Sequence, residues 1–442
     1  MILPITGENF LQMFAGTITM AYMGRVSPLA VGAVGIGNLV FRILWSFFKG
    51  LGVGAAAYVA RKFGGNHFND IRTIAGGGVV FAFCSGIVVT VVLLGTGDML
   101  LRVFSDNPLF LGSAGEFLSI IALSLPFAGV ILFVSGVLQG TGDARTPMII
   151  VGWLNFVNVI LGFLLVFGVG PLPPLGLRGA GYAFLAGHLV AAFMSLLALQ
   201  GFFRALASQK SQHQDESFPR ALLTLMSYGI PTALEITFWL ISSIFVSRAI
   251  LFHGELEYAA YQLALQAESF SYMPAAGIGI AATAFIGQAL GGGDSELARA
   301  YFKEIKAITL GITLLSAGVL VGAPYWIMRL MTDQSALIPL GATYLFIMGF
   351  TQLPQNFMLL YHGVFRGAGL PKLPLANTMI GIWLVRVPTV LFATFVLEAP
   401  ILWIWLMIVL DLLVRYGIAR GLFKRKNVLG DIEGHQTTRE ME

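Results

Sequence analysis

The stretch Lys49-Gly50-Leu51-Gly52-Val53-Gly54-Ala55-Ala56-Ala57 returns in altered form 227 positions later, as Ala276-Gly277-Ile278-Gly279-Ile280-Ala281-Ala282-Thr283-Ala284. The same offset places Gly140, Gly142 and Pro147 on Gly367, Gly369 and Pro374, and Pro4 and Glu8 on Pro231 and Glu235. Because several matches share one spacing, the sequence predicts an internal duplication in which one helical unit occurs twice.

The composition indicates a membrane protein. Hydrophobic residues make up 57% of the 442 residues and charged residues only 11%, whereas a soluble domain carries roughly 25% charged residues. The net charge of +4 is too small to indicate nucleic-acid binding. Cys84 is the one cysteine, which excludes a disulfide within the chain and makes a cysteine metal site implausible.

The apolar runs predict an all-α membrane protein with twelve transmembrane helices in two six-helix lobes, related by a pseudo-two-fold axis along the membrane normal. The expected domains are an N-lobe (1–203), a cytoplasmic linker (204–220), a C-lobe (221–423) and a cytoplasmic tail (424–442). The predicted spans are 2–23, 32–60, 73–97, 113–138, 147–168, 179–203, 221–249, 258–286, 303–331, 338–365, 374–396 and 398–422.

Lys and Arg set the expected orientation. They concentrate in the segments that lie inside when the N-terminus is cytoplasmic, among them Arg61, Lys62 and Lys424. By the positive-inside rule, both termini should be cytoplasmic. We expect a multi-pass protein of a prokaryotic plasma or inner membrane.

Three carboxylates fall inside predicted spans of the C-lobe, where an ionised side chain is costly and therefore a functional candidate. Glu235 and Glu268 should lie about 7–8 Å apart in depth, close enough to share a proton or hold a cation. Asp411 could join them in ion coupling. Its alternative is a salt bridge with Arg415 or with Arg386.

The N-lobe contains a different set of charges. Glu8 is the repeat partner of Glu235, but it should lie level with Arg42 and Lys49. We expect Glu8 to pair with one of these cations, with ion binding as the alternative. All three are candidates for lining a cavity or contacting substrate.

Four further residues are cavity or substrate candidates. Asn155 and Asn158 lie one turn apart in the fifth predicted span, where they could instead form hydrogen bonds between helices. Tyr361 could line a cavity or face a neighbouring helix. Arg386 lies in the eleventh predicted span.

The sequence contains no signature of an enzyme. The histidines are scattered, so no metal-ligand cluster is predicted, and no Walker-type nucleotide motif occurs. We expect no cofactor. Na⁺ enters only as a coupling ion at Glu235 and Glu268.

In its ordered motifs the chain resembles the multidrug and toxic compound extrusion (MATE) family. The motifs extend from the first to the eleventh predicted span. They are Met23-Gly24-Arg25, Val137-Leu138-Gln139-Gly140-Thr141-Gly142-Asp143, Ile230-Pro231-Thr232-Ala233-Leu234-Glu235, Phe365-Arg366-Gly367-Ala368-Gly369 and Trp383-x-x-Arg386.

The resemblance implies two six-helix lobes and export of organic cations or other xenobiotics against a Na⁺ or H⁺ gradient. It also implies an acidic residue in the seventh span, which Glu235 matches. Two acidic positions of the family's N-lobe are here Thr19 and Gly162. Coupling should therefore depend on C-lobe carboxylates.

We therefore predict a secondary active antiporter that works by alternating access on lipophilic organic cations, surrounded by membrane lipids and monomeric. The coupling ion, Na⁺ or H⁺, stays open. The alternative is a flippase or exporter of lipid-linked or anionic cargo, since Arg42, Lys49 and Arg386 suit a phosphate-bearing substrate. A passive channel and an intramembrane enzyme are weaker alternatives.

Overall fold

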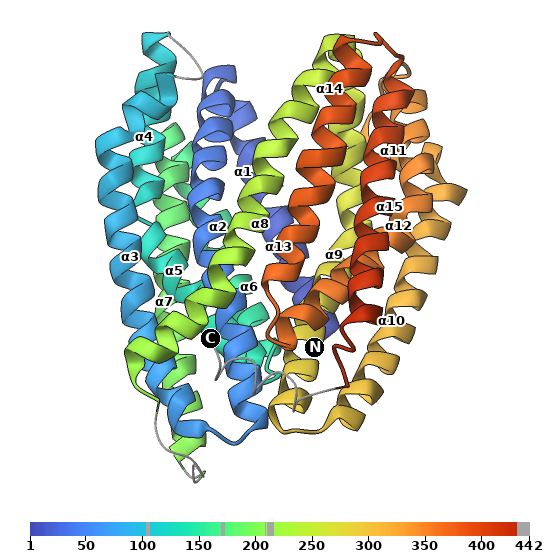
Figure 1. Cartoon of the computed structure of the whole chain (residues 1–442). Coiled ribbons are helices and arrows are strands. Elements are labelled where there is room, and N and C mark those ends of the chain that lie inside the picture. The colour runs from blue at the N-terminus through green and yellow to red at the C-terminus, as the bar shows by residue number, and fades with distance from the viewer. Residues whose placement is uncertain (103–106, 169–172, 208, 210–215, 431–442) are drawn as a thin grey trace. The chain divides into compact units, whose positions relative to one another are not determined.

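The computed structural model describes residues 1–102, 107–168, 173–207, 209 and 216–430. Within these residues all regular structure is helical (Figure 1), which confirms the predicted all-α class. Parts of two predicted segments lie outside the described residues: positions 208 and 210–215 of the linker, and 431–442 of the tail.

The helices follow one another with short connections. The first part of the chain forms α1 (Ile2–Val26), α2 (Pro28–Gly64), α3 (Phe68–Arg102), α4 (Pro108–Ala122), α5 (Leu125–Gly140), α6 (Arg145–Phe167) and α7 (Gly176–Ala207). The second part forms α8 (Phe218–His253), α9 (Glu255–Gly291), α10 (Ser295–Gly322), α11 (Pro324–Met331), α12 (Leu337–Gly367), α13 (Lys372–Met379), the π-helix η1 (Ile380–Arg386), α14 (Val387–Phe395) and α15 (Ile401–Arg425).

The described helices agree with the twelve predicted spans. Ten candidate spans are long and apolar enough to cross a membrane, and α4 with α5, bent by 45°, makes an eleventh. The remaining predicted span, the first along the chain, corresponds to α1, whose 25 residues extend about 37 Å. This is long enough to cross a membrane, although α1 is not among the helices that are also apolar enough. Several spans are interrupted where the sequence predicts one continuous helix, and proline begins the new helix at Pro324 of α11.

The chain divides into two compact units between Ala233 and Leu234, inside α8. We call them the N-terminal unit and the C-terminal unit. The sequence places the division earlier, in the linker 204–220. The difference arises because the first half of α8 packs on α2: a Cβ atom at Gly50 would lie 2.6 Å from the carbonyl oxygen of Gly229.

Both units use the same backbone packing, as the duplication predicts. In the N-terminal unit, Gly136 of α5 lies so close to Gly52 of α2 that a Cβ atom would collide with the Gly52 carbonyl. In the C-terminal unit, Gly363 of α12 lies against Gly279 of α9 in the same way. Each residue of the second pair follows its counterpart by 227 positions, so equivalent helices make equivalent contacts.

The turns that follow these helices repeat as well. Gly142, after α5, has a φ of 98°, and Gly369, after α12, has a φ of 83°. Residues without a Cβ adopt such values readily. The duplication read from the sequence is therefore a duplication of backbone structure.

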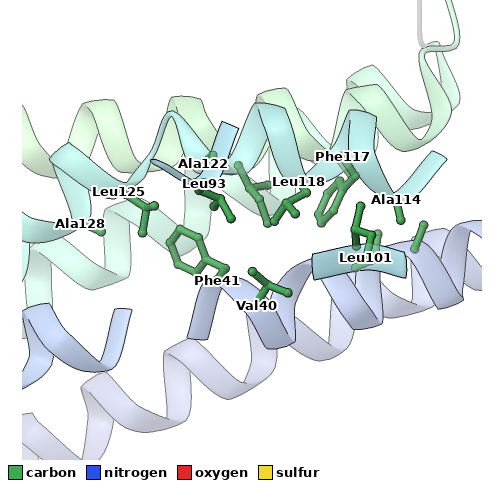
Figure 2. Packing of buried hydrophobic residues seen from close by; sticks show 14 of the residues in the cluster. Val40, Phe41, Leu93, Leu101, Ala114, Phe117, Leu118, Ala122, Leu125 and Ala128 are labelled. Atoms are coloured by element: carbon green, nitrogen blue, oxygen red, sulfur yellow. The ribbon is translucent and has the colours of Figure 1, made fainter. Parts of the chain in front are cut away.

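Apolar side chains fill the interior of each unit. Figure 2 shows part of the N-terminal core, in which Phe41 of α2 packs near Leu93 of α3 and Leu125 of α5. The corresponding core of the C-terminal unit surrounds Tyr261, Tyr344 and Trp405. Ala267 and Leu412 of this core are sequence neighbours of the buried Glu268 and Asp411.

Candidate functional site

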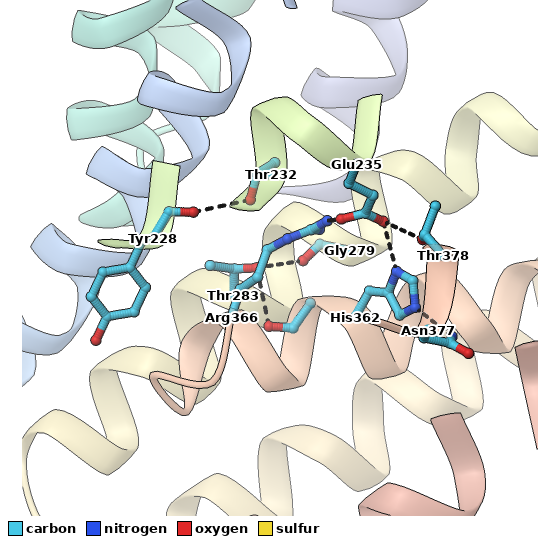
Figure 3. Close-up of polar contacts among 10 residues, drawn as sticks. Tyr228, Thr232, Glu235, Gly279, Thr283, His362, Arg366, Asn377 and Thr378 are labelled. Atoms are coloured by element: carbon cyan, nitrogen blue, oxygen red, sulfur yellow. Dashed lines mark hydrogen bonds and ion pairs between the residues drawn. The ribbon is translucent and has the colours of Figure 1, made fainter. Parts of the chain in front are cut away.

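Glu235 lies at the centre of a polar network in the C-terminal unit (Figure 3). Arg366 Nη2 donates to Glu235 Oε2 at 2.5 Å. His362 Nδ1 lies 3.0 Å from Oε1, and Thr378 Oγ1 donates to the same oxygen at 3.2 Å. Both carboxylate oxygens are thus bonded, and the arginine supplies a compensating charge.

Two helices bring these partners to α8. His362 and Arg366 are four residues apart on α12 and therefore share one face. Thr378 comes from α13, and its neighbour Asn377 binds the other ring nitrogen of His362 at 2.9 Å. Because His362 is 1% exposed and held at both nitrogens, it is a fixed part of the network.

Glu268 of α9 lies in a different environment. Its side chain is 5% exposed, and the hydroxyl of Tyr344 on α12 donates to Oε2 at 2.8 Å. The ring of Tyr344 stacks edge-on against Tyr261 at 5.4 Å. Among the described residues, no cation lies within 4 Å of this carboxylate.

The structure does not bring Glu235 and Glu268 into contact. Glu235 binds Arg366, His362 and Thr378, whereas Glu268 binds Tyr344. The described part of the chain also holds no group of three or more His, Cys, Asp or Glu side chains that could hold a metal ion. The two glutamates therefore belong to two separate sets of hydrogen bonds.

Asp411 of α15 forms the salt bridges that were the alternative to ion coupling. Arg415 donates from Nε to Oδ1 at 2.9 Å and from Nη2 to Oδ2 at 2.7 Å. Arg386, at the end of η1, adds a third contact to Oδ2 at 2.7 Å. Gly381 lies directly over this cluster, where a Cβ atom would come 2.5 Å from Asp411 Oδ1.

In the N-terminal unit, the expected ion pair of Glu8 with Arg42 or Lys49 is not formed. Glu8 is 3% exposed and accepts a hydrogen bond from Gln139 Nε2 at 3.4 Å. Lys49 interacts with it electrostatically, but the Lys49 ammonium lies over the ring of Trp45 at 5.7 Å. Arg42 is exposed. The hydrogen-bond partner of the Glu8 carboxylate is thus Gln139 of α5, a residue that the sequence interpretation did not consider.

The remaining candidates are buried among neighbouring helices. Asn155 and Asn158 on α6 are 7% and 6% exposed, and Asn158 faces Gly187 of α7. Asn155 Nδ2 has no hydrogen-bond partner. Tyr361 packs in an aromatic cluster, 5.2 Å from Phe423. Of the two readings of Tyr361, the structure favours a contact with neighbouring helices.

The family model MatE matches residues 4–164 and 229–392. The chain belongs to the MatE family. It is 27% identical over 421 residues to the probable multidrug resistance protein NorM of Thermotoga maritima, an alignment that covers 93% of this chain and 88% of the relative. It is 23% identical to the multidrug resistance protein MdtK of Yersinia enterocolitica, with 88% and 85% covered.

Solved structures show the same fold. An outward-facing multidrug resistance MATE family transporter of the MOP superfamily superposes with a TM-score of 0.86 at 20% identity, covering 97% of this chain and 95% of that one. A MOP superfamily transporter from Pyrococcus furiosus gives the same values. The chain is thus a multi-pass membrane protein of a transporter family, as the sequence indicated.

Thr19 and Gly162, the two positions at which the sequence departs from the family pattern, lie in well-defined local contacts. The Thr19 hydroxyl donates to the carbonyl of Ala15 within α1 at 3.0 Å. Beside Gly162, the ring of Tyr22 lies 3.5 Å from where a Cβ atom would be, and its hydroxyl reaches the Val159 carbonyl at 3.4 Å. An aromatic ring therefore occupies the space next to Gly162.

The sequence interpretation missed His362 and Arg366 as partners of Glu235. A signal for Arg366 was present in the duplication, because Arg366 follows Gln139 by the same 227 positions by which Glu235 follows Glu8. The two contacts are equivalent in the two units: Gln139 with Glu8 and Arg366 with Glu235. His362 has no such signal, since its counterpart is Ser135.

Proposed function

We propose that this MatE protein is a secondary active multidrug exporter that exchanges organic cations and other xenobiotics for Na⁺ or H⁺ by alternating access. The names of the relatives NorM and MdtK support multidrug efflux. The distribution of Lys and Arg supports cytoplasmic termini in a cell membrane. We further propose that it works as a monomer.

The observation that carries the coupling proposal is the environment of Glu268. This carboxylate is buried in a candidate membrane span and has one neutral hydrogen-bond donor, Tyr344. A buried carboxylate without a salt bridge is costly when charged. Uptake of a proton or a Na⁺ ion removes that cost, and we assign ion coupling to Glu268.

The other two candidate carboxylates of the C-terminal unit, Glu235 and Asp411, have charged partners, which fits a structural role. Glu235 has Arg366 and His362, and Asp411 has two arginines. A Na⁺ ion at either would compete with a guanidinium already in hydrogen-bond contact. At Glu268 only one oxygen has a donor, so the other is available to an ion.

The position of Glu268 suggests how ion binding could change the helix. The carbonyl of Glu268 accepts a hydrogen bond from Ser271 Oγ at 2.7 Å, and Pro274 lies six residues further along α9. Proline removes a backbone hydrogen bond and permits bending. We propose that an ion at Glu268 shifts the population between two shapes of α9, which requires that the ion bind them with different affinity.

Reconstitution tests this assignment. Liposomes loaded with a fluorescent organic cation are placed under a Na⁺ or a proton gradient, with wild type, Glu268→Gln and Glu235→Gln measured side by side. We expect gradient-driven efflux in wild type and its loss, by at least about tenfold, in Glu268→Gln. Glu235→Gln, if it folds, should keep the gradient dependence. Full gradient-driven efflux in Glu268→Gln would contradict the assignment.

A second candidate function is export of anionic or lipid-linked cargo. It is favoured by Arg42, which is exposed, and by Lys49, which makes no salt bridge within the described residues. Absence of organic-cation efflux in wild type under both gradients would favour this candidate. Loss of anion movement in Arg42→Gln with Lys49→Gln would then support it.

A further inference from the structure

The duplication allows the polar residues of the C-terminal unit to be compared with the residues at the equivalent positions of the N-terminal unit. Subtracting 227 places Glu268 on Phe41, Tyr344 on Phe117 and Asp411 on Phe184. In the N-terminal unit these are apolar: the rings of Phe41 and Phe184 meet edge-on at 5.1 Å. Phe41 and Phe117 also belong to one core cluster (Figure 2). The N-terminal unit thus packs apolar rings where the C-terminal unit has polar side chains, so the packing of this fold does not by itself require the polar set.

Arg386 is a surplus cation in that polar set. Asp411 is fully buried and already receives two parallel hydrogen bonds from Arg415, an arrangement that satisfies a carboxylate. Arg386 binds the same carboxylate through Nη2. Its Nε is buried without a hydrogen-bond partner, and a buried N–H without an acceptor is costly.

Glu268 is the carboxylate available to this cation. One core cluster contains Ala267, which precedes Glu268, together with Val390, one turn after Arg386, and Leu412, which follows Asp411. The Arg386 guanidinium interacts electrostatically with Glu268 and with Tyr261 and Tyr344, the two tyrosines beside it.

We propose that Arg386 is a built-in competitor of the coupling ion at Glu268. When Glu268 is without an ion, its charge attracts the guanidinium, and Asp411 stays paired with Arg415. When a proton or Na⁺ binds Glu268, Arg386 returns to Asp411, the arrangement seen in the structure. Ion binding and the position of Arg386 would thus be linked. That the ion bound at Glu268 is the coupling ion rests on the proposed function.

The local backbone suits a side chain with two positions. Arg386 ends η1, a π-helix that covers residues 380–386. Such segments are rare and are frequent at functional sites. Gly381, one π-turn before Arg386, leaves room for Asp411 and Arg415 beneath the backbone. The arginine is therefore attached where the helix departs from regular geometry.

The transport test uses Arg386→Met, with Arg386→Lys as the charge-preserving variant. Removing the competitor should lower the ion concentration for half-maximal efflux about tenfold, because one neighbouring positive charge is lost. Uphill efflux at saturating ion should fall, since ion release loses its driving group. Arg386→Lys should lie between the two. An unchanged or raised half-saturating concentration in Arg386→Met would overturn the proposal.

A binding test does not depend on transport. Purified protein in alkaline, sodium-free buffer is melted with and without added Na⁺ or acid. We expect the ion to raise the melting temperature of Arg386→Met more than that of wild type, because tighter binding stabilises more, and Glu268→Gln to abolish this difference.

Glu235→Gln is the matched control, since it removes a carboxylate of the same unit that has its own arginine. It should leave the extra stabilisation of Arg386→Met unchanged. Equal ion effects with and without Arg386 would overturn the proposal. Wild type that binds the ion but drives no efflux would instead count against the proposed function. Because Asp411 keeps Arg415, Arg386→Met should fold, and Arg386→Lys replaces it if it does not.

Discussion

At the residue scale, the two equivalent contacts of the duplication differ in charge. Glu8 receives a hydrogen bond from a neutral amide at 3.4 Å, whereas Glu235 receives one from a guanidinium at 2.5 Å. Both glutamates are buried or nearly so, at 3% and 14% exposure. One fold position therefore holds a neutral contact in one unit and an ion pair in the other.

The ion pair predicts a specific pattern of stability. Arg366→Met leaves the Glu235 carboxylate without its cation, and breaking a buried pair in this way costs about 3–5 kcal/mol. We expect a lower melting temperature for Arg366→Met in detergent and a partial recovery in Glu235→Gln with Arg366→Met, because no unpaired charge is left. Additive losses in the double variant would show that the two residues do not act as a pair.

The sequence predicted the acidic residues of this site and the arginine partners of Asp411, but not the partners of Glu235 and Glu268. Depth along a helix follows from counting residues, and that placed Glu235 and Glu268 inside the membrane. Which helix faces a carboxylate depends on rotation and tilt, which counting does not give. For this reason Glu8 was expected to pair with Arg42 or Lys49, whereas Gln139 donates to it in the structure.

At the element scale, close glycine contacts fix the pairs α2–α5 and α9–α12. Gly363→Ala should destabilise the protein by about 1–3 kcal/mol, because its methyl group would meet the Gly279 carbonyl. Gly311→Ala on α10 is the control, since nothing lies within 4 Å of its added Cβ atom. There the change should be neutral or stabilising by up to about 1 kcal/mol. Thermal unfolding measures both, and equal melting temperatures would argue against close packing.

At this scale the sequence predicted where the membrane-spanning helices lie, but it did not predict well where they are interrupted. Long apolar runs fixed the spans because the bilayer sets their length. The break between α4 and α5 at Leu123 and Ser124 precedes Pro126, but proline also lies inside unbroken helices, as Pro231 does in α8. Neighbouring helices decide which prolines end a helix, and a single sequence does not reveal that packing.

At the scale of the whole molecule, the predicted orientation rests on Lys and Arg and can be tested with two serines. Ser295 follows α9 on the side predicted to be cytoplasmic, and Ser335, which is exposed, precedes α12 on the opposite side. In a Cys84→Ser background, which removes the one native thiol, each serine is replaced by the nearly isosteric cysteine. A membrane-impermeant maleimide should label Ser335→Cys in intact cells, and Ser295→Cys only after the cells are opened. The reverse pattern would place both termini outside. Labelling of both cysteines in intact cells would show instead that α10 with α11, the segment between the two serines, does not cross the membrane as the twelve-span arrangement requires.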